Sequence, residues 1–231
     1  MSVRAAVFAS GGGSNLQSLL DHEVSDGPYR VELVISDREE AGALERGRAD
    51  GREAVVIPVK GRPKEEVEAE TLEALSTHAI EVIFLAAYLR LIPEGVVRSF
   101  PRRMLNIHPA LLPSFGGKGM WGHHVHEAVL ASGAKMSGPT IHYVDEEYDR
   151  GTIFAQWPVP VLPDDGPDEL AARVLRVEHV LYPLAADHLC RALGAGEEPA
   201  PFAVPGGAFA TSGEFSAAET ADLIKRAFER S

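Results

Sequence analysis

Asn106 and His108 are polar side chains, two residues apart, in a stretch that is otherwise typical of a buried strand. The stretch is LNIHPALLPSF, residues 105–115. Residues i and i+2 of a strand point to the same face, so the amide and the imidazole would share one side. Such a pair suits acyl transfer, because an amide N–H can stabilise an oxyanion and an imidazole can carry a proton. Alternatively, both side chains satisfy backbone groups at a strand end, and the spacing alone leaves the two interpretations open.

A glycine-rich loop, ASGGGSN at residues 9–15, lies between an expected strand and an expected helix. Backbone N–H groups at a helix N-terminus can bind a phosphate, and glycines allow the ligand to approach closely. The loop lacks the lysine of the nucleoside-triphosphatase phosphate loop and the third glycine of the dinucleotide fingerprint. We expect a phosphate site of another kind. The alternative is a tight turn in which Ser14 or Asn15 caps the helix.

Glu178 interrupts an apolar helix face. Val174, Glu178, Leu181 and Ala185 follow one another at spacings of four, three and four residues. This spacing places all of them on one side of a helix. A carboxylate among apolar side chains costs free energy unless it has a partner. We expect the partner to be a substrate amine, with a salt bridge to an arginine as the alternative.

Alternating apolar strands and helices position these residues. The pattern predicts an α/β fold with a doubly wound, mostly parallel sheet, whose strand ends would bring the glycine loop close to Asn106 and His108. Two later strands, joined by a short acidic turn, predict an antiparallel pair in the C-terminal half. The expected strands are residues 3–9, 30–36, 53–59, 80–88, 103–108, 135–146 and 151–161, and a long helix is expected at 167–193.

The composition narrows the classes of function. The chain has 231 residues, a formal net charge of −12 and one cysteine. Its acidity argues against a nucleic-acid partner, and one cysteine allows no internal disulfide. We expect a cytoplasmic protein without a membrane partner, since neither a signal-like N-terminus nor a long apolar span is present. Residues 1–195 are predicted to form one domain and 196–231 a C-terminal extension with a terminal helix, where Ser216 and Glu219 fit a capping box.

Five motifs occur in the order found in the phosphoribosylglycinamide formyltransferases of purine synthesis, and residues 3–195 resemble that family. The resemblance implies the formyltransferase fold. It also implies transfer of a formyl group from 10-formyltetrahydrofolate to the amine of glycinamide ribonucleotide, without a metal. Both substrates are small molecules, and monomer and homodimer are left open. The motifs are FASGGGSNLQSLL, FLAAYLRLIP, LNIHPALLPSF, SGPTIHYVDEEYDRGTI and RVEHVLYPL.

The resemblance also implies roles for individual residues. The family's catalytic residues correspond to Asn106, His108 and Asp149. The residues that would bind the ribonucleotide are Gly12, Gly13, Ser14, Asn15 and Glu178. The residues that would bind the folate are Lys64, Leu89, Arg90, Leu91, Ile92 and Asp145. The glycine-rich loop at 115–124 departs from the shortest family members, so no contact is carried over to it.

Asp149 would be an ordinary turn aspartate without the resemblance. If its carboxylate lies near His108, it favours the imidazolium, and we expect it to raise the pKa of that histidine. A protonated His108 would then stabilise the oxyanion together with Asn106. Asp149 would accept, through water, the proton that leaves the attacking amine.

Other functions fit parts of the sequence. A formyltetrahydrofolate deformylase usually carries an N-terminal regulatory domain, for which a first strand at Val3 leaves no room. Methionyl-tRNA formyltransferase is longer and has a tRNA-binding domain, which the acidic charge and the short tail argue against. A non-catalytic nucleotide-binding module would leave the predicted catalytic residues without a purpose. A zinc site at His123, His124 and His126 is not expected, because their spacing is poor for one helix face.

Overall fold

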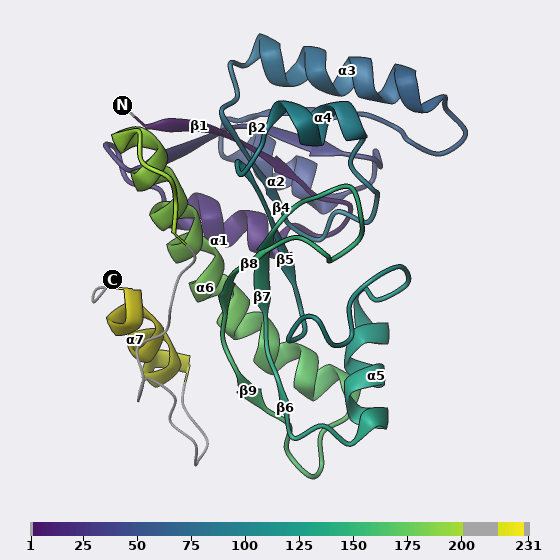
Figure 1. The fold of residues 1–231 in the computed structure, drawn as a ribbon, viewed down its shortest axis with the longest axis vertical. Coiled ribbons are helices and arrows are strands. Elements are labelled where there is room, and N and C mark those ends of the chain that lie inside the picture. The colour runs from purple at the N-terminus through teal and green to yellow at the C-terminus, as the bar shows by residue number, and fades with distance from the viewer. Residues whose placement is uncertain (1, 201–216, 229–231) are drawn as a thin grey trace.

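The computed structural model describes residues 2–200 and 217–228. Its central sheet is built from β1 (Val3–Phe8), β2 (Tyr29–Ser36), β3 (Glu53–Val56), β4 (Val82–Leu85), β5 (Met104–His108), β7 (Thr140–Tyr143) and β8 (Ile153–Gln156), as Figure 1 shows. The strand order is β3-β2-β1-β4-β5-β7-β8. Strands β1 to β5 pair in parallel, whereas β7 runs antiparallel to both β5 and β8. The predicted doubly wound sheet and its antiparallel pair are confirmed.

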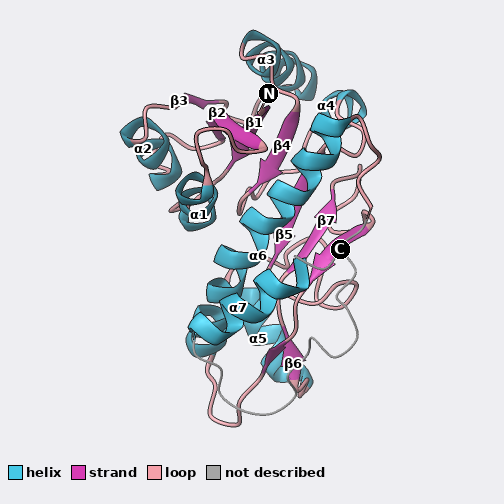
Figure 2. Ribbon diagram, turned by 90° about the vertical axis from the view of Figure 1, so that its left-hand side faces the viewer, coloured by secondary structure: helices cyan, strands magenta, loops and turns pink. Residues whose placement is uncertain are grey.

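Helices cover both faces of this sheet (Figure 2). Val7 belongs to the hydrophobic core that includes Leu16 and Tyr182, whereas the next residue, Phe8, belongs to the core that includes Leu75. Successive strand residues point to opposite faces, so the two cores alternate along β1. The helices are α1 (Ser14–His22), α2 (Gly42–Ala49), α3 (Lys64–Thr77), α4 (Glu94–Ser99), α5 (His123–Ser132), α6 (Pro167–Ala195) and α7 (Ala217–Phe228). The cores show that α3 and α4 cover one face and α1 and α6 the other.

The order of the strands reverses between β1 and β4. From β1 the chain moves outward to β3, and it then returns to place β4 on the other side of β1. At such a switch point the loops after the two central strands diverge and leave a crevice at their carboxyl ends. Ser10 N–H donates to Ala87 O at 3.1 Å, and Leu89 N–H donates to Ser10 Oγ at 2.9 Å. These bonds hold the glycine loop beside the segment 86–92.

The C-terminal half is more broken than predicted. The expected strand at 135–146 contains β6 (Met136–Ser137) and β7, and that at 151–161 contains β8 and β9 (Val159–Pro160). The short strands β6 and β9 pair antiparallel in a ribbon of their own. The breaks fall at Pro139 and Pro158, which have no N–H to donate to a sheet. One continuous strand was therefore the wrong prediction for either segment.

Helices α5 and α7 compare differently with the sequence predictions. The sequence analysis did not anticipate α5. The expected terminal helix is present as α7, and its Ile224 is buried in the core shared with α6. Ser216 of the predicted capping box lies outside the described residues. The division into 1–195 and 196–231 stays a prediction.

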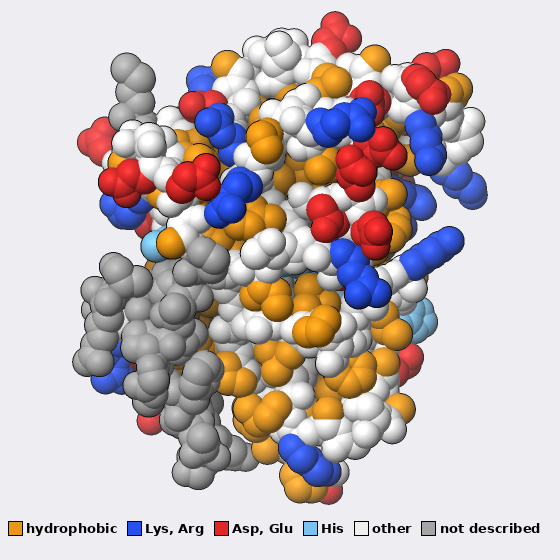
Figure 3. All heavy atoms as spheres, viewed as in Figure 1, with side chains coloured by type: hydrophobic (Ala, Val, Ile, Leu, Met, Phe, Trp, Pro, Cys, Tyr) orange, Lys and Arg blue, Asp and Glu red, His pale blue; other side chains and the backbone are white. Residues whose placement is uncertain are grey.

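The surface mixes charges of both signs on the face shown in Figure 3. Over the described residues of that face, lysine and arginine side chains do not gather into one broad basic area, which agrees with the net charge of −12. Hydrophobic side chains are more frequent in the lower half of this view, where β6 and β9 lie. None of the helices in residues 2–200 and 217–228 is long and apolar enough to cross a membrane.

The Tyr182 hydroxyl bonds α6 to the ends of β4 and β5, and removal of that hydroxyl tests how much the bonds stabilise the fold. Its buried hydroxyl lies 2.9 Å from Leu85 O and 3.0 Å from Leu105 O. Tyr182→Phe leaves these carbonyl groups without that donor, so the free energy of unfolding in urea should fall by about 1–3 kcal/mol. Tyr88→Phe is the control, because the Tyr88 hydroxyl has no hydrogen bond to the described residues. Its free energy of unfolding should differ from the wild-type value by less than about 0.5 kcal/mol. Equal losses in both variants would contradict this role.

Candidate active site

A cavity of about 750 Å³ opens at the carboxyl ends of β4 and β5, with α5 and α6 forming its other wall. Most of the predicted site residues line it, although they come from distant parts of the chain. These are Ser14, Asn15, Leu89, Arg90, Leu91, Ile92, Asn106, His108, Asp145, Asp149 and Glu178. Gly12 and Gly13 lie in the adjoining glycine loop. Lys64 is the exposed first residue of α3 and does not belong to the lining.

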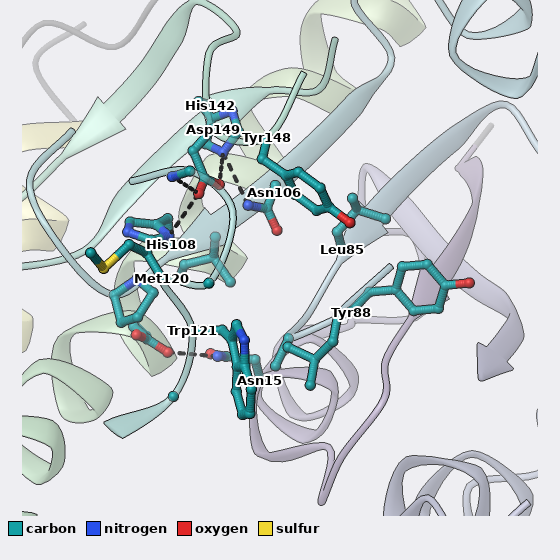
Figure 4. Close-up of a pocket in the computed structure, with 18 of the residues that line it drawn as sticks. Asn15, Leu85, Tyr88, Asn106, His108, Met120, Trp121, His142, Tyr148 and Asp149 are labelled. Atoms are coloured by element: carbon teal, nitrogen blue, oxygen red, sulfur yellow. Dashed lines mark hydrogen bonds and ion pairs between the residues drawn. The ribbon is translucent and has the colours of Figure 1, made fainter. Parts of the chain in front are cut away.

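Asn106 is held by the neighbouring strand. The register pairs it with His142 of β7, and Asn106 Nδ2 donates to His142 Nε2 at 3.0 Å (Figure 4). His142 Nδ1 lies 2.8 Å from Tyr143 O. A carbonyl oxygen only accepts hydrogen bonds, so Nδ1 carries the proton of a neutral His142 ring. This arrangement fixes the Asn106 amide and leaves its second N–H and its carbonyl oxygen to a ligand.

Asp149 lies between two imidazoles. Its Oδ1 is 3.5 Å from His142 Nε2, and its Oδ2 is 3.6 Å from His108 Nδ1. Gly117 N–H donates to Oδ2 at 2.8 Å. Burial alone would raise the pKa of Asp149, but the neighbouring His142 and His108 rings and the Gly117 N–H lower it below the usual 3.8. Asp149 is therefore a carboxylate at neutral pH.

Burial has the largest effect on the pKa of His108, whose side chain is only 3% exposed. The loss of solvation lowers the pKa of His108 below the usual 6.5, and it outweighs Asp149 and the bond to Phe115 O, which both raise it. The expected rise in this pKa is therefore wrong. Burial destabilises the imidazolium by desolvation more than the Asp149 carboxylate, 3.6 Å away, stabilises it. His108 Nε2–H donates to Phe115 O at 2.9 Å, so Nδ1 is the nitrogen that can take up a proton, and it faces Asp149.

Glu178 has a partner that the sequence analysis did not name. Asn15 Nδ2 donates to Glu178 Oε2 at 2.7 Å, and both side chains are buried. This bond takes the place of the salt bridge that was the alternative. Burial raises the pKa of Glu178, and the bond from Asn15 offsets only part of that rise. The bond also joins the glycine loop to α6 across one end of the cavity.

The glycine loop needs glycine at one position in particular. Gly13 has a φ of 77°, and a Cβ there would lie 2.7 Å from Ala43 Cα. Gly13 is also the residue before α1, and no side chain caps the helix. The alternative in which Ser14 or Asn15 acts as cap is therefore wrong. The first N–H groups of α1 have no side-chain cap, which suits an anion at this helix end.

Arg90 has a structural partner as well as a place in the lining. Its Nε donates to Asp37 Oδ2 at 2.6 Å, and the Asp37 side chain is only 1% exposed. This ion pair fixes the guanidinium group at the edge of the cavity. The Arg90 side chain therefore supports the structure, while the segment 89–92 contributes to the lining.

The three histidines near the start of α5 differ in their exposure to solvent. His123 and His124 are exposed, each with its Nδ1 close to a carboxylate oxygen, whereas His126 is buried at the cavity. Burial lowers the pKa of His126 to about 4, so its ring is neutral at pH 7. Within residues 2–200 and 217–228, no group of three or more His, Cys, Asp or Glu side chains is arranged so that it could hold a metal ion.

Comparison with known proteins assigns the chain to a family. Residues 3–186 match the formyl transferase family. The chain belongs to that family. The resemblance and the formyltransferase fold predicted from the sequence are thus confirmed for most of its length.

Individual relatives of the formyl transferase family support the same assignment. The chain is 47% identical over 192 residues to the chloroplastic phosphoribosylglycinamide formyltransferase of Arabidopsis thaliana, covering 81% of this chain and 65% of that protein. It is 34% identical over 180 residues to the phosphoribosylglycinamide formyltransferase of Escherichia coli K12, covering 77% and 82%. The crystal structure of phosphoribosylglycinamide formyltransferase from Brucella melitensis matches with a TM-score of 0.75 and 40% identity, covering 82% and 96%. The chain thus spans just under two thirds of the plant relative's length.

Sequence reasoning left several residues of this candidate site undecided or unnoticed. His142 alternates with Ile141 and Tyr143 along its strand, a pattern that does not decide its role, and only its register with Asn106 assigns it to the site. Trp121, His126 and Tyr148 also line the cavity, and no motif singled them out as ligand contacts. The alternation of His142 with Ile141 and Tyr143 was the one available signal.

The titration of His108 tests the account of its surroundings. Followed by NMR, the imidazole should titrate with a midpoint below 6.5 in the folded protein. In Asp149→Asn the midpoint should fall further, because the carboxylate favours the imidazolium. The unfolded chain binds this proton at the higher, ordinary pKa, so His108 makes folding less favourable as the pH falls below 6.5. A midpoint above 6.5, or a rise in the variant, would contradict the account.

Proposed function

We propose that the protein transfers the formyl group of 10-formyltetrahydrofolate to the amine of glycinamide ribonucleotide, a step of de novo purine synthesis. One observation carries the proposal: Asn106, His108 and Asp149 meet in one cavity beside the glycine loop. The names of the Arabidopsis, Escherichia coli and Brucella relatives, all phosphoribosylglycinamide formyltransferases, support it.

The reaction moves one formyl group and one proton. The amine nitrogen attacks the formyl carbon, and the carbonyl electron pair moves onto oxygen. Collapse of the tetrahedral intermediate breaks the bond between carbon and N10 of the folate. The free N–H of Asn106 donates to the oxyanion. The attacking nitrogen loses a proton and N10 gains one, so a group that accepts and returns a proton is needed between them.

His108 and Asp149 are the proposed carriers of that proton. A neutral His108 can accept it at Nδ1, where Asp149 then stabilises the imidazolium across 3.6 Å. The lowered pKa of His108 keeps the ring free to accept at neutral pH. The protonated ring adds positive charge beside the oxyanion before it passes the proton on. In this route His108 is neutral before the reaction, whereas the sequence analysis expected it to be protonated already.

The cavity has a part for each substrate in this proposal. The ribonucleotide phosphate binds to the N–H groups of the loop Gly12, Gly13, Ser14 and Asn15, and Glu178 binds the glycinamide end. The folate lies against the segment Leu89, Arg90, Leu91 and Ile92, with Asp145 at the turn beyond β7. Contact of Lys64 with the folate stays a prediction, because Lys64 is outside the cavity lining.

Location and assembly complete the proposal. Cys190 is the single cysteine and it is buried, which suits a compartment where disulfides do not form. We therefore keep the cytoplasm as the proposed compartment. Both a monomer and a homodimer fit the proposal, because the cavity is lined by one chain.

Turnover with the two substrates tests the function. The protein incubated with glycinamide ribonucleotide and 10-formyltetrahydrofolate should convert the folate, as followed by absorbance, and should yield the formylated ribonucleotide. Omission of the ribonucleotide should abolish folate conversion. Release of formate in its absence would instead identify a deformylase.

The oxyanion role of Asn106 predicts a large loss of rate. Asn106→Ala should lower kcat by about two to three orders of magnitude, which corresponds to about 3–4 kcal/mol. Asn106→Asp has nearly the same shape but lacks the N–H donor, and it should lose at least as much. Steady-state kinetics with both substrates measures the change. If Asn106→Asp keeps near wild-type kcat, N–H donation is not what Asn106 contributes.

A further inference from the structure

Trp121 is an unusually exposed aromatic residue within the cavity. It is 49% exposed, yet it lines the same cavity as the candidate catalytic residues. Its ring meets that of His124 edge-on, at 5.1 Å between the centroids. Within the described part of the chain, its indole N–H has no hydrogen-bond acceptor. An aromatic side chain that leaves so much apolar surface open inside a pocket is a typical ligand contact.

The loop that carries Trp121 is attached to the catalytic residues. Phe115 O accepts from His108, and Gly117 N–H donates to Asp149. Beyond this root, Gly119 and Gly122 have φ values of 93° and 56°, a region that favours glycine. Trp121 thus follows a root that is bonded to the candidate catalytic residues.

Trp121 lies at the α6 side of the cavity. His123, two residues later, has its Nδ1 3.2 Å from Asp168 Oδ1 in the first turn of α6. Further along, α6 carries Glu178, which also lines the cavity and accepts the bond from Asn15. In Figure 4 the open cavity separates Trp121 from Asn106 and Tyr148. Trp121 is thus on the side of the glycine loop and away from the turn that holds Tyr148.

We propose that Trp121 is a specificity-determining contact for the ribonucleotide, with its indole ring covering the sugar. The inference rests on the proposed function and adds a residue to it. A sugar ring presents C–H groups on one face, which suit an aromatic surface, and its hydroxyls can accept from the indole N–H. The bond from Asn15 to Glu178 joins the phosphate-binding loop to the residue that binds the glycinamide end, so the sugar lies beside both. The exposed ring of Trp121 is then buried only when the ribonucleotide is bound.

Separate Michaelis constants for the two substrates test this assignment. Trp121→Ala should raise the KM for glycinamide ribonucleotide about tenfold, and leave kcat and the KM for 10-formyltetrahydrofolate within about twofold. Trp121→Phe keeps an aromatic ring, so its KM for the ribonucleotide should rise less than about threefold. Met136→Ala is the matched control, because Met136 is 46% exposed but lies outside the cavity, and it should change neither constant.

Fluorescence gives a readout that does not depend on turnover. The chain has two tryptophans, and Trp157 is only 5% exposed and lies outside the cavity. Glycinamide ribonucleotide alone has no aromatic group that absorbs at the excitation wavelength. Its addition should change the emission of the wild-type protein, and should leave that of Trp121→Phe unchanged.

The outcomes separate this inference from the proposed function. Wild-type turnover combined with an unchanged ribonucleotide KM in Trp121→Ala would overturn the role of Trp121 alone. A rise confined to the KM for the folate would overturn it too, and would move Trp121 to the other substrate. A wild-type protein without turnover would overturn the proposed function. A Trp121-dependent emission change with the ribonucleotide would still support the contact in that case.

Discussion

The parallel pairing of β1 and β4 is the constraint on which the rest of the molecule depends. Two parallel strands must both end at the same edge of the sheet, and the chain leaves β1 and β4 toward opposite sides. The glycine loop and the segment 86–92 therefore face each other across a crevice. Tyr182 ties α6 to the ends of β4 and β5, which carries Glu178 to the same crevice. The cavity is thus a consequence of topology before any catalytic side chain is considered.

A continuous set of hydrogen bonds and close polar contacts then orients the proposed catalytic groups. Asn106 is held by His142, His142 by the Tyr143 carbonyl, and Asp149 lies against both imidazoles. The same carboxylate accepts from Gly117 and so fixes the root of the loop that carries Trp121. The proposed catalytic and substrate-covering parts are thereby coupled, since a shift of the loop would move a partner of Asp149.

Desolvation sets the electrostatic character of the cavity more than net charge does. The chain carries −12 overall, yet burial lowers the pKa of both His108 and His126, so two neutral imidazoles line the cavity. Burial also raises the pKa of Glu178, whereas neighbouring donors outweigh it at Asp149. The surroundings thus shift the pKa values of two carboxyl groups of one site in opposite directions.

The sequence by itself determined the alternation of strands and helices, the doubly wound sheet and the shared face of Asn106 and His108, because strand and helix periods are local properties. The tertiary structure decided what depends on contacts between distant segments. The register of β5 with β7 made His142 the partner of Asn106, and the packing of α1 on α6 gave Glu178 to Asn15 rather than to an arginine. It also reversed the expected pKa shift of His108, since the degree of burial is a property of the whole fold and not of the neighbours in the chain.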